Sequence, residues 1–91
     1  MKVMTENKLE EYRKQIDIID TKIVELFSKR FELVKQIGKI KQKNKIPVVD
    51  NNRFQKVLEK VENIAEKQGV SKDFINDIYN IIHKYSCELE M

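Results

Sequence analysis

The sequence is poor in the residues that build tight turns, disulfides and membrane spans. Its 91 residues include no tryptophan, one proline, one cysteine and two glycines, while 36% of them are charged. So few turn formers leave little material for a sheet protein and favour helices. Cys87 has no internal partner for a disulfide, and no apolar run approaches the roughly 18 residues of a membrane span. We therefore expect an all-α, cytoplasmic protein without a membrane partner.

Charges of both signs are interleaved along the chain, so the net charge is only +3. This pattern favours small anions at least as much as nucleic acid as ligands. Only three of the 18 basic residues are arginines: Arg13, Arg30 and Arg53. A guanidinium grips carboxylate or phosphate through two parallel hydrogen bonds, so each arginine is a candidate anion ligand.

Apolar residues recur at three- and four-residue spacing from Leu9 to Ile40. This heptad seam predicts one helix from about residue 6 to about residue 43, capped by Thr5. Such a helix is roughly 57 Å long. It is longer than a compact chain of this size is wide, so one chain cannot cover its own apolar face. We therefore expect a dimer along this helix.

Two shorter helices are predicted after a loop that contains Pro47. Proline disfavours helix at the residue before it, which places a loop over residues 44–49. Asp50 is expected to cap the second helix, which ends at Gly69, and Ser71 to cap the third. The prediction is a single domain over residues 1–91 with one long and two shorter helices.

Arg30 interrupts the heptad seam where an apolar residue is due. A buried guanidinium needs a counter-ion, which is either a protein carboxylate that fixes the helix register or an anionic ligand. Lys41 shares its helix face roughly 16 Å further along, so both cations can close on one small anion. Arg13 is about 25 Å away in the other direction, and in an antiparallel dimer it would reach the partner's pocket instead.

The third helix offers few further candidates. Ser86 and Glu90 are four residues apart and border its apolar face, where they either face the core or form an ordinary exposed last turn. His83 and Cys87 are also four apart, but two ligands make a poor zinc site, and we assign no metal. The chain has no glycine-rich phosphate loop and no nucleophile motif, so we expect chemistry without a cofactor.

Five short segments, in this order and at these spacings, carry a resemblance to a known family: Arg13–Asp20, Leu26–Arg30, Ile37–Lys41, Pro47–Arg53 and Ile82–Ser86. Together they resemble the all-helical (type II) chorismate mutases over nearly the whole chain. The resemblance implies an isomerase of the shikimate pathway that rearranges chorismate to prephenate without a cofactor. It also implies an intertwined homodimer in which each site receives an arginine from the other subunit.

The same resemblance assigns seven residues to the substrate pocket: Arg13, Arg30, Lys41, Asp50, Arg53, Ser86 and Glu90. The arginines, with Arg13 supplied by the partner chain, would surround the two carboxylates of the substrate. Lys41 and Glu90 would contact the ether oxygen, where the family commonly has glutamine in place of Glu90. A second departure is Phe54, at a position where the family often has a glutamate that holds the substrate hydroxyl. Gln55 or backbone groups near Asp50 are the substitutes we expect.

Two other readings stay open at this point. An isochorismate pyruvate-lyase would use the same helical scaffold and cationic pocket, although the loop Pro47–Asp50 looks more like the mutases. A non-catalytic helical dimer that binds nucleic acid would need a continuous basic stripe, which the interleaved acidic residues disfavour. The resemblance also leaves open an association with another shikimate-pathway enzyme.

Overall fold

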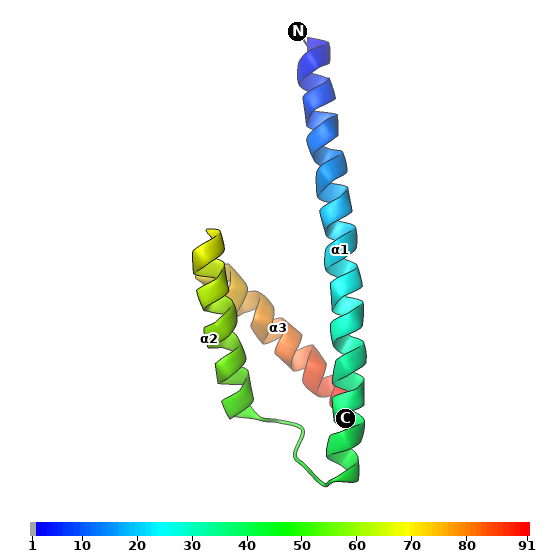
Figure 1. The fold of residues 1–91 in the computed structure, drawn as a ribbon, viewed down its shortest axis with the longest axis vertical. Helices are drawn as coiled ribbons and strands as arrows, with labels where there is room; N and C mark the ends of the chain where they lie inside the picture. Colours follow the sequence, from blue (N-terminus) through cyan, green and yellow to red (C-terminus); the bar gives the residue numbers. More distant parts are fainter. Residues whose placement is uncertain (1) are drawn as a thin grey trace. The chain divides into compact units, whose positions relative to one another are not determined.

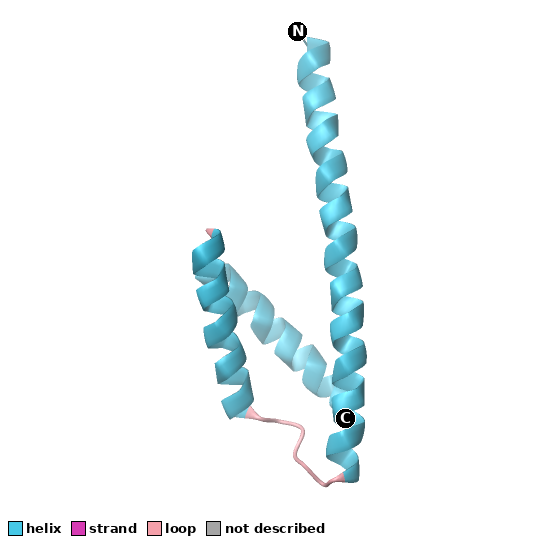
Figure 2. Cartoon of the chain, in the orientation of Figure 1, coloured by secondary structure: helices cyan, strands magenta, loops and turns pink. Residues whose placement is uncertain are grey.

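The chain folds into three helices joined by one loop and one tight turn (Figures 1 and 2). The structure, a computed structural model, describes the backbone of residues 2–91 and the side chains of residues 4–91. α1 spans Lys2–Lys43, α2 Asn51–Gln68 and α3 Lys72–Glu90, and this part of the chain contains no strand. The all-α prediction is confirmed. Residues 1–32 and residues 33–91 form two compact units, which are described separately.

Local chemistry explains most of the helix ends. Asp50 caps α2 by accepting a hydrogen bond from the Arg53 amide at 3.0 Å, and Ser71 caps α3 in the same way. Gly69 ends α2 in the left-handed conformation, with φ 71°, as predicted. The predicted cap at Thr5 is wrong, because α1 already begins at Lys2 and Thr5 lies inside it. The residues before Thr5 contain no proline or glycine that would stop the helix.

Lys45 occupies a backbone position that favours glycine. It has φ 55° and follows the end of α1, where the Ile46 amide donates to the Lys41 carbonyl at 2.8 Å. This is a C-terminal cap of the Schellman type, in which a side chain at the left-handed residue costs about 1 kcal/mol. We expect Lys45→Gly to raise the free energy of unfolding by about 0.5–1 kcal/mol, measured by thermal unfolding. Lys43→Gly, inside the helix, should lower it, and a Lys45→Gly variant no more stable than the parent would contradict the prediction.

In residues 33–91, α2 and α3 lie side by side and share a small core (Figure 1). Leu58 and Ala65 of α2 and Ile82 of α3 are buried there, and the Asn76 amide donates to the Glu62 carboxylate at 3.0 Å. A neighbouring apolar stripe of α3 is open to solvent: Phe74 is 55% exposed and Ile81 70% exposed. The core of this unit therefore covers only one face of α3.

In residues 1–32, the seam of α1 is exposed along its length. Its six apolar members retain between 44% and 62% of their surface: Leu9, Tyr12, Ile16, Ile19, Ile23 and Leu26. Apolar residues repeated on one helix face are typical of a surface that packs against another helix.

No helix in the described part of the chain is long and apolar enough to cross a bilayer.

Candidate active site

A lysine at the end of α1 and a glutamate at the end of α3 form a closely spaced ion pair in the second unit. Lys41 lies in the last turn of α1 and Glu90 is the last residue of α3. Their Nζ and Oε1 atoms are 2.7 Å apart, and the side chains are only 17% and 9% exposed. Oε1 is shielded from solvent. Its contact with Nζ is short, but the two groups are not aligned as they would be in a hydrogen bond. We therefore treat the contact as an ion pair, strengthened by the partial exclusion of water.

The Lys41 ammonium also holds the loop between α1 and α2. Nζ donates a hydrogen bond to the Val48 carbonyl at 2.8 Å. An ammonium has three N–H donors and the Val48 carbonyl uses one, so at least one donor remains for a further acceptor beside the ion pair with Glu90. Lys41 thus joins the end of α1, the loop and the end of α3 at one point, and it retains capacity to bind a ligand.

Ser86 lies one turn before Glu90 on α3 and is 7% exposed. The spacing of four residues places both side chains on one stripe of the helix. Of the two alternatives for this stripe, the structure supports the buried one, because Ser86 is buried and the Glu90 side chain nearly so. The described unit therefore brings a hydroxyl, a carboxylate and an ammonium to the C-terminal end of α3.

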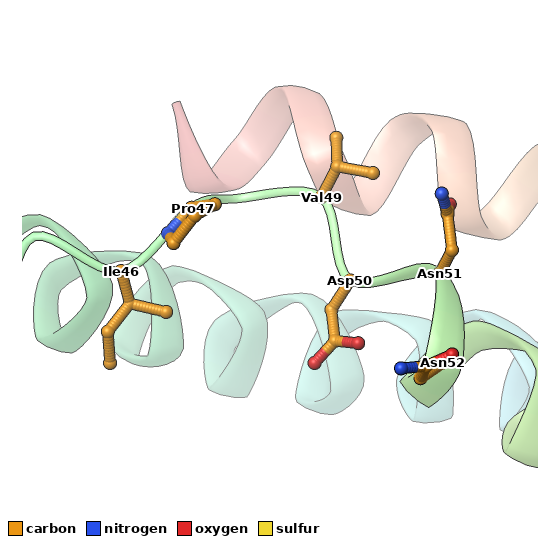
Figure 3. A pocket seen from close by; sticks show the side chains of 6 residues that line it. All are labelled: Ile46, Pro47, Val49, Asp50, Asn51 and Asn52. Atoms are coloured by element: carbon orange, nitrogen blue, oxygen red, sulfur yellow. The ribbon is translucent and has the colours of Figure 1, made fainter.

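Asp50 and Arg53 lie at the start of α2, where both are exposed. The Asp50 carboxylate accepts from the Arg53 amide, so its visible role is to cap the helix. An open hollow of about 500 Å³ adjoins this cap and is lined by Ile46, Pro47, Val49 and residues 50–52 (Figure 3). In that view Ile46 and Asp50 point to one side of the loop and Val49 to the other. Asp50 is the one predicted site residue among the lining residues.

The remaining two arginines belong to the first unit. Arg13 is exposed on α1, and Arg30 is half-buried. A half-buried position fits the interruption of the apolar seam at Arg30, since a guanidinium there keeps part of its hydration. Their approach to a substrate remains a prediction.

Phe54 is used for packing in this structure. Its ring stacks on the imidazole of His83, with ring centroids 3.9 Å apart and planes 8° from parallel. The Sγ atom of Cys87 lies 3.7 Å from Nε2 of the same histidine. Phe54 therefore ties α2 to α3, and it has no polar group with which to hold a substrate hydroxyl. Sequence reasoning gave His83 no role, because stacking between two helices leaves no trace in helical periodicity.

The charged pair also acts on the thiol of Cys87. Partial burial and then the Glu90 carboxylate raise the pKa of Cys87, while the Lys41 ammonium lowers it. Glu90→Gln removes one of the raising causes, so more thiolate forms below the pKa. We expect this variant to react with iodoacetamide about two- to threefold faster at pH 8, followed by mass spectrometry. Glu88→Gln, an exposed neighbour on α3, is the matched control, and equal rates in all three proteins would contradict the prediction.

The arrangement suits binding and electrostatic stabilisation of an anion rather than covalent catalysis. Lys41 presents a cation with a free donor, in surroundings that exclude much of the water. In residues 4–91, no three histidine, cysteine, aspartate or glutamate side chains gather closely enough to hold a metal ion. The charged groups therefore point to a small anionic ligand with an acceptor atom near Lys41.

Comparison with known proteins gives a consistent result. The family model for chorismate mutase type II matches residues 12–91. The chorismate mutase of Methanocaldococcus jannaschii is 30% identical over 83 residues, which cover 91% of this chain and 84% of that protein. The T-protein of Haemophilus influenzae is 39% identical over 70 residues, covering 77% of this chain and 19% of that protein. The bifunctional chorismate mutase/prephenate dehydratase of Buchnera aphidicola is 35% identical over 78 residues, covering 86% of this chain and 20% of that protein.

These matches differ in how much of each relative they span. The chain corresponds to about a fifth of the T-protein and of the bifunctional enzyme, but to most of the archaeal chorismate mutase. The matched range, residues 12–91, includes all seven predicted pocket residues and all of α2 and α3. The chain belongs to the type II chorismate mutase family.

Proposed function

We propose that the protein catalyses the rearrangement of chorismate to prephenate. The observation that carries the proposal is the Lys41 ammonium, which is held 2.7 Å from Glu90 and keeps one donor for a ligand. It lies in a chain of a family whose archaeal relative is named chorismate mutase. The reaction breaks one C–O bond and forms one C–C bond within a single molecule.

A protein can accelerate such a reaction by restraining the conformation of the substrate and by placing a charge beside the breaking bond. No proton or electron is exchanged, so neither a cofactor nor a nucleophile is needed. Binding the flexible enolpyruvyl arm in its reactive conformation removes part of the barrier. A positive group beside the breaking ether oxygen stabilises the negative charge that develops there. In this proposal Lys41 supplies that charge, and Glu90 contacts the same oxygen.

The three arginines provide the restraint in this scheme. The substrate is a dianion, and Arg30, Arg53 and the partner's Arg13 would grip its two carboxylates. Ser86 and Asp50 complete the pocket as polar contacts. These roles come from the family resemblance, and they are supported by the exposure of Arg53 at the start of α2 and the burial of Ser86.

The proposed enzyme is a homodimer. Two apolar surfaces are exposed: the seam of residues 1–32 and the stripe of α3 with Phe74 and Ile81. Exposed apolar surfaces of this kind are typical of protein–protein interfaces. A second copy supplies both surfaces at once, as in most soluble oligomers. Sedimentation equilibrium should give twice the mass of one chain, and a monomer at micromolar concentration would contradict the proposal.

The cell compartment and the partner enzyme follow as further parts of the proposal. We place the protein in the cytoplasm, where a lone thiol such as Cys87 stays reduced. Relatives that are fused to prephenate dehydratase suggest association with an enzyme that consumes prephenate. Retention of the purified protein on such an immobilised enzyme would test this association.

The direct test is conversion of chorismate by the purified protein without added metal or cofactor. We expect prephenate to form with saturation kinetics, detected by the loss of chorismate absorbance and by chromatography of the product. Isochorismate assayed in parallel should release no pyruvate. Pyruvate from isochorismate, without prephenate from chorismate, would assign the chain to the lyase reaction and overturn the proposal.

Glu90 gives the proposed reaction a pH dependence. A glutamate can donate a hydrogen bond to the ether oxygen only when it is protonated, whereas the carboxylate repels the charge that develops there and pairs with Lys41. We therefore expect kcat to rise towards acidic pH. Glu90→Gln keeps a donor at all pH values and should flatten the profile, measured between pH 4.5 and 8. A variant with the same pH profile as the parent would exclude this role of Glu90.

A further inference from the structure

Gly38 of α1 lies directly against the last residue of α3. A Cβ atom added at position 38 would be 2.8 Å from the Cα atom of Glu90 and 2.9 Å from its carbonyl oxygen. Both atoms belong to the backbone, so no change of rotamer can relieve the contact. Figure 1 shows the end of α3, in red, beside the green end of α1. The missing side chain of Gly38 is therefore what permits the two helices to approach this closely.

Glycine is otherwise a poor choice at this position. After proline it is the least favourable residue in the interior of a helix, and Gly38 lies inside α1 with regular helix on both sides. Its backbone has no left-handed conformation that would require glycine. The close approach of the Glu90 backbone is the feature of its surroundings that excludes a side chain.

The approach bears directly on the charged pair. Lys41 is three residues after Gly38, on the same side of α1, and Glu90 supplies both the backbone at Gly38 and the carboxylate at Lys41. Ordinary contact with a Cβ atom needs at least 3.4 Å, so any side chain at position 38 would push Glu90 outward by about half an ångström or more. The carboxylate moves with its backbone, away from an ammonium that Val48 holds in place.

We propose that Gly38 is a positioning residue that sets the distance between the Glu90 carboxylate and the Lys41 ammonium. It touches neither the substrate nor the reacting atoms, and it acts through Glu90. The consequence for catalysis rests on the proposed function, whereas the consequence for the ion pair does not. The two can therefore be tested separately.

The structural test compares crystal structures of the parent protein and Gly38→Ala. We expect the distance between Nζ of Lys41 and Oε1 of Glu90 to increase from 2.7 Å by about half an ångström or more, which weakens the ion pair. Lys39→Ala, at an exposed position of the same turn, should leave the pair intact. A Gly38→Ala structure that keeps the short contact would overturn the inference.

The kinetic test is a double-mutant cycle with Glu90→Ala. At the acidic end of the pH range, where Glu90 is the donor to the ether oxygen in the proposed function, Gly38→Ala should lower kcat by on the order of 100-fold in the parent, with a smaller change in KM, because a misplaced catalytic group weakens the stabilisation of the transition state. In the Glu90→Ala background the same substitution should cost less than about threefold, since the group that it displaces is gone. Equal losses in both backgrounds would indicate a general structural effect and overturn the inference.

Two further observations separate the possible failures. A parent protein that does not convert chorismate contradicts the proposed function, and the crystallographic distance then decides about Gly38 alone. Alanine favours helix over glycine, so Gly38→Ala should keep its circular dichroism signal and melt cooperatively. A variant that loses its helices would assign Gly38 to folding and overturn the positioning role.

Discussion

Replacing Lys41 with alanine should lower kcat/KM for chorismate by about a thousandfold. The loss of one preorganised donor at a developing negative charge costs on the order of 10²–10³-fold in enzymes. Here the same substitution also removes the counter-ion of Glu90, which is only 9% exposed, and the donor to the Val48 carbonyl. A carboxylate left without its cation beside the ether oxygen adds to the loss.

The substitution needs matched controls, because Lys41 also fastens the loop. Lys39→Ala removes an exposed lysine from the same helical turn and should retain full activity. Lys41→Arg keeps the charge, but its planar fork does not fit the geometry of an ammonium that meets Val48 and Glu90. We expect it to lose most of the activity as well. Steady-state kinetics measures kcat/KM, and circular dichroism in parallel shows whether each variant is folded. A folded Lys41→Ala variant whose kcat/KM is within tenfold of the parent value would exclude Lys41 as the charge-stabilising group.

The helices could be predicted where local rules decide. Pro47, Gly69 and the caps at Asp50 and Ser71 act through their own backbone and nearest turns, so both ends of α2 and the start of α3 follow from the sequence. The start of α1 does not follow in this way. A threonine can cap a helix or continue it, and Thr5 continues it because the preceding residues also permit helix.

The contacts between helices could be predicted only in part. Periodicity places Ser86 and Glu90 on one stripe of α3, but it does not give the depth to which α3 approaches α1. That depth depends on Gly38, where a side chain would collide with the Glu90 backbone. The sequence does not predict this contact, because Gly38 lies inside a regular helix. The stacking of Phe54 on His83 is hidden for the same reason, since both residues occupy ordinary helical positions. Non-local packing decides these contacts.

Mixing two inactive variants should restore activity if the proposed dimer shares its sites. Arg13→Ala removes the arginine that one subunit lends to the other, and Lys41→Ala removes the cation that each chain supplies to its own site. A mixed dimer then has one site with both defects and one site with neither. Random exchange of subunits should therefore recover about a quarter of the parent activity from two inactive preparations.

The control for this experiment pairs two residues that the proposal assigns to the same chain. In a mixed dimer of Arg53→Ala and Lys41→Ala each site carries one of the two defects, so no intact site forms and activity should stay at the level of the separate variants. The variants must be mixed under conditions that exchange subunits, such as unfolding and refolding together, and assayed with chorismate. Recovery in the first mixture alone supports a site composed across two subunits. If mass spectrometry shows that subunits have exchanged but the mixture of Arg13→Ala and Lys41→Ala stays inactive, Arg13 does not act across the dimer. It would then act within its own chain or have no role in the site.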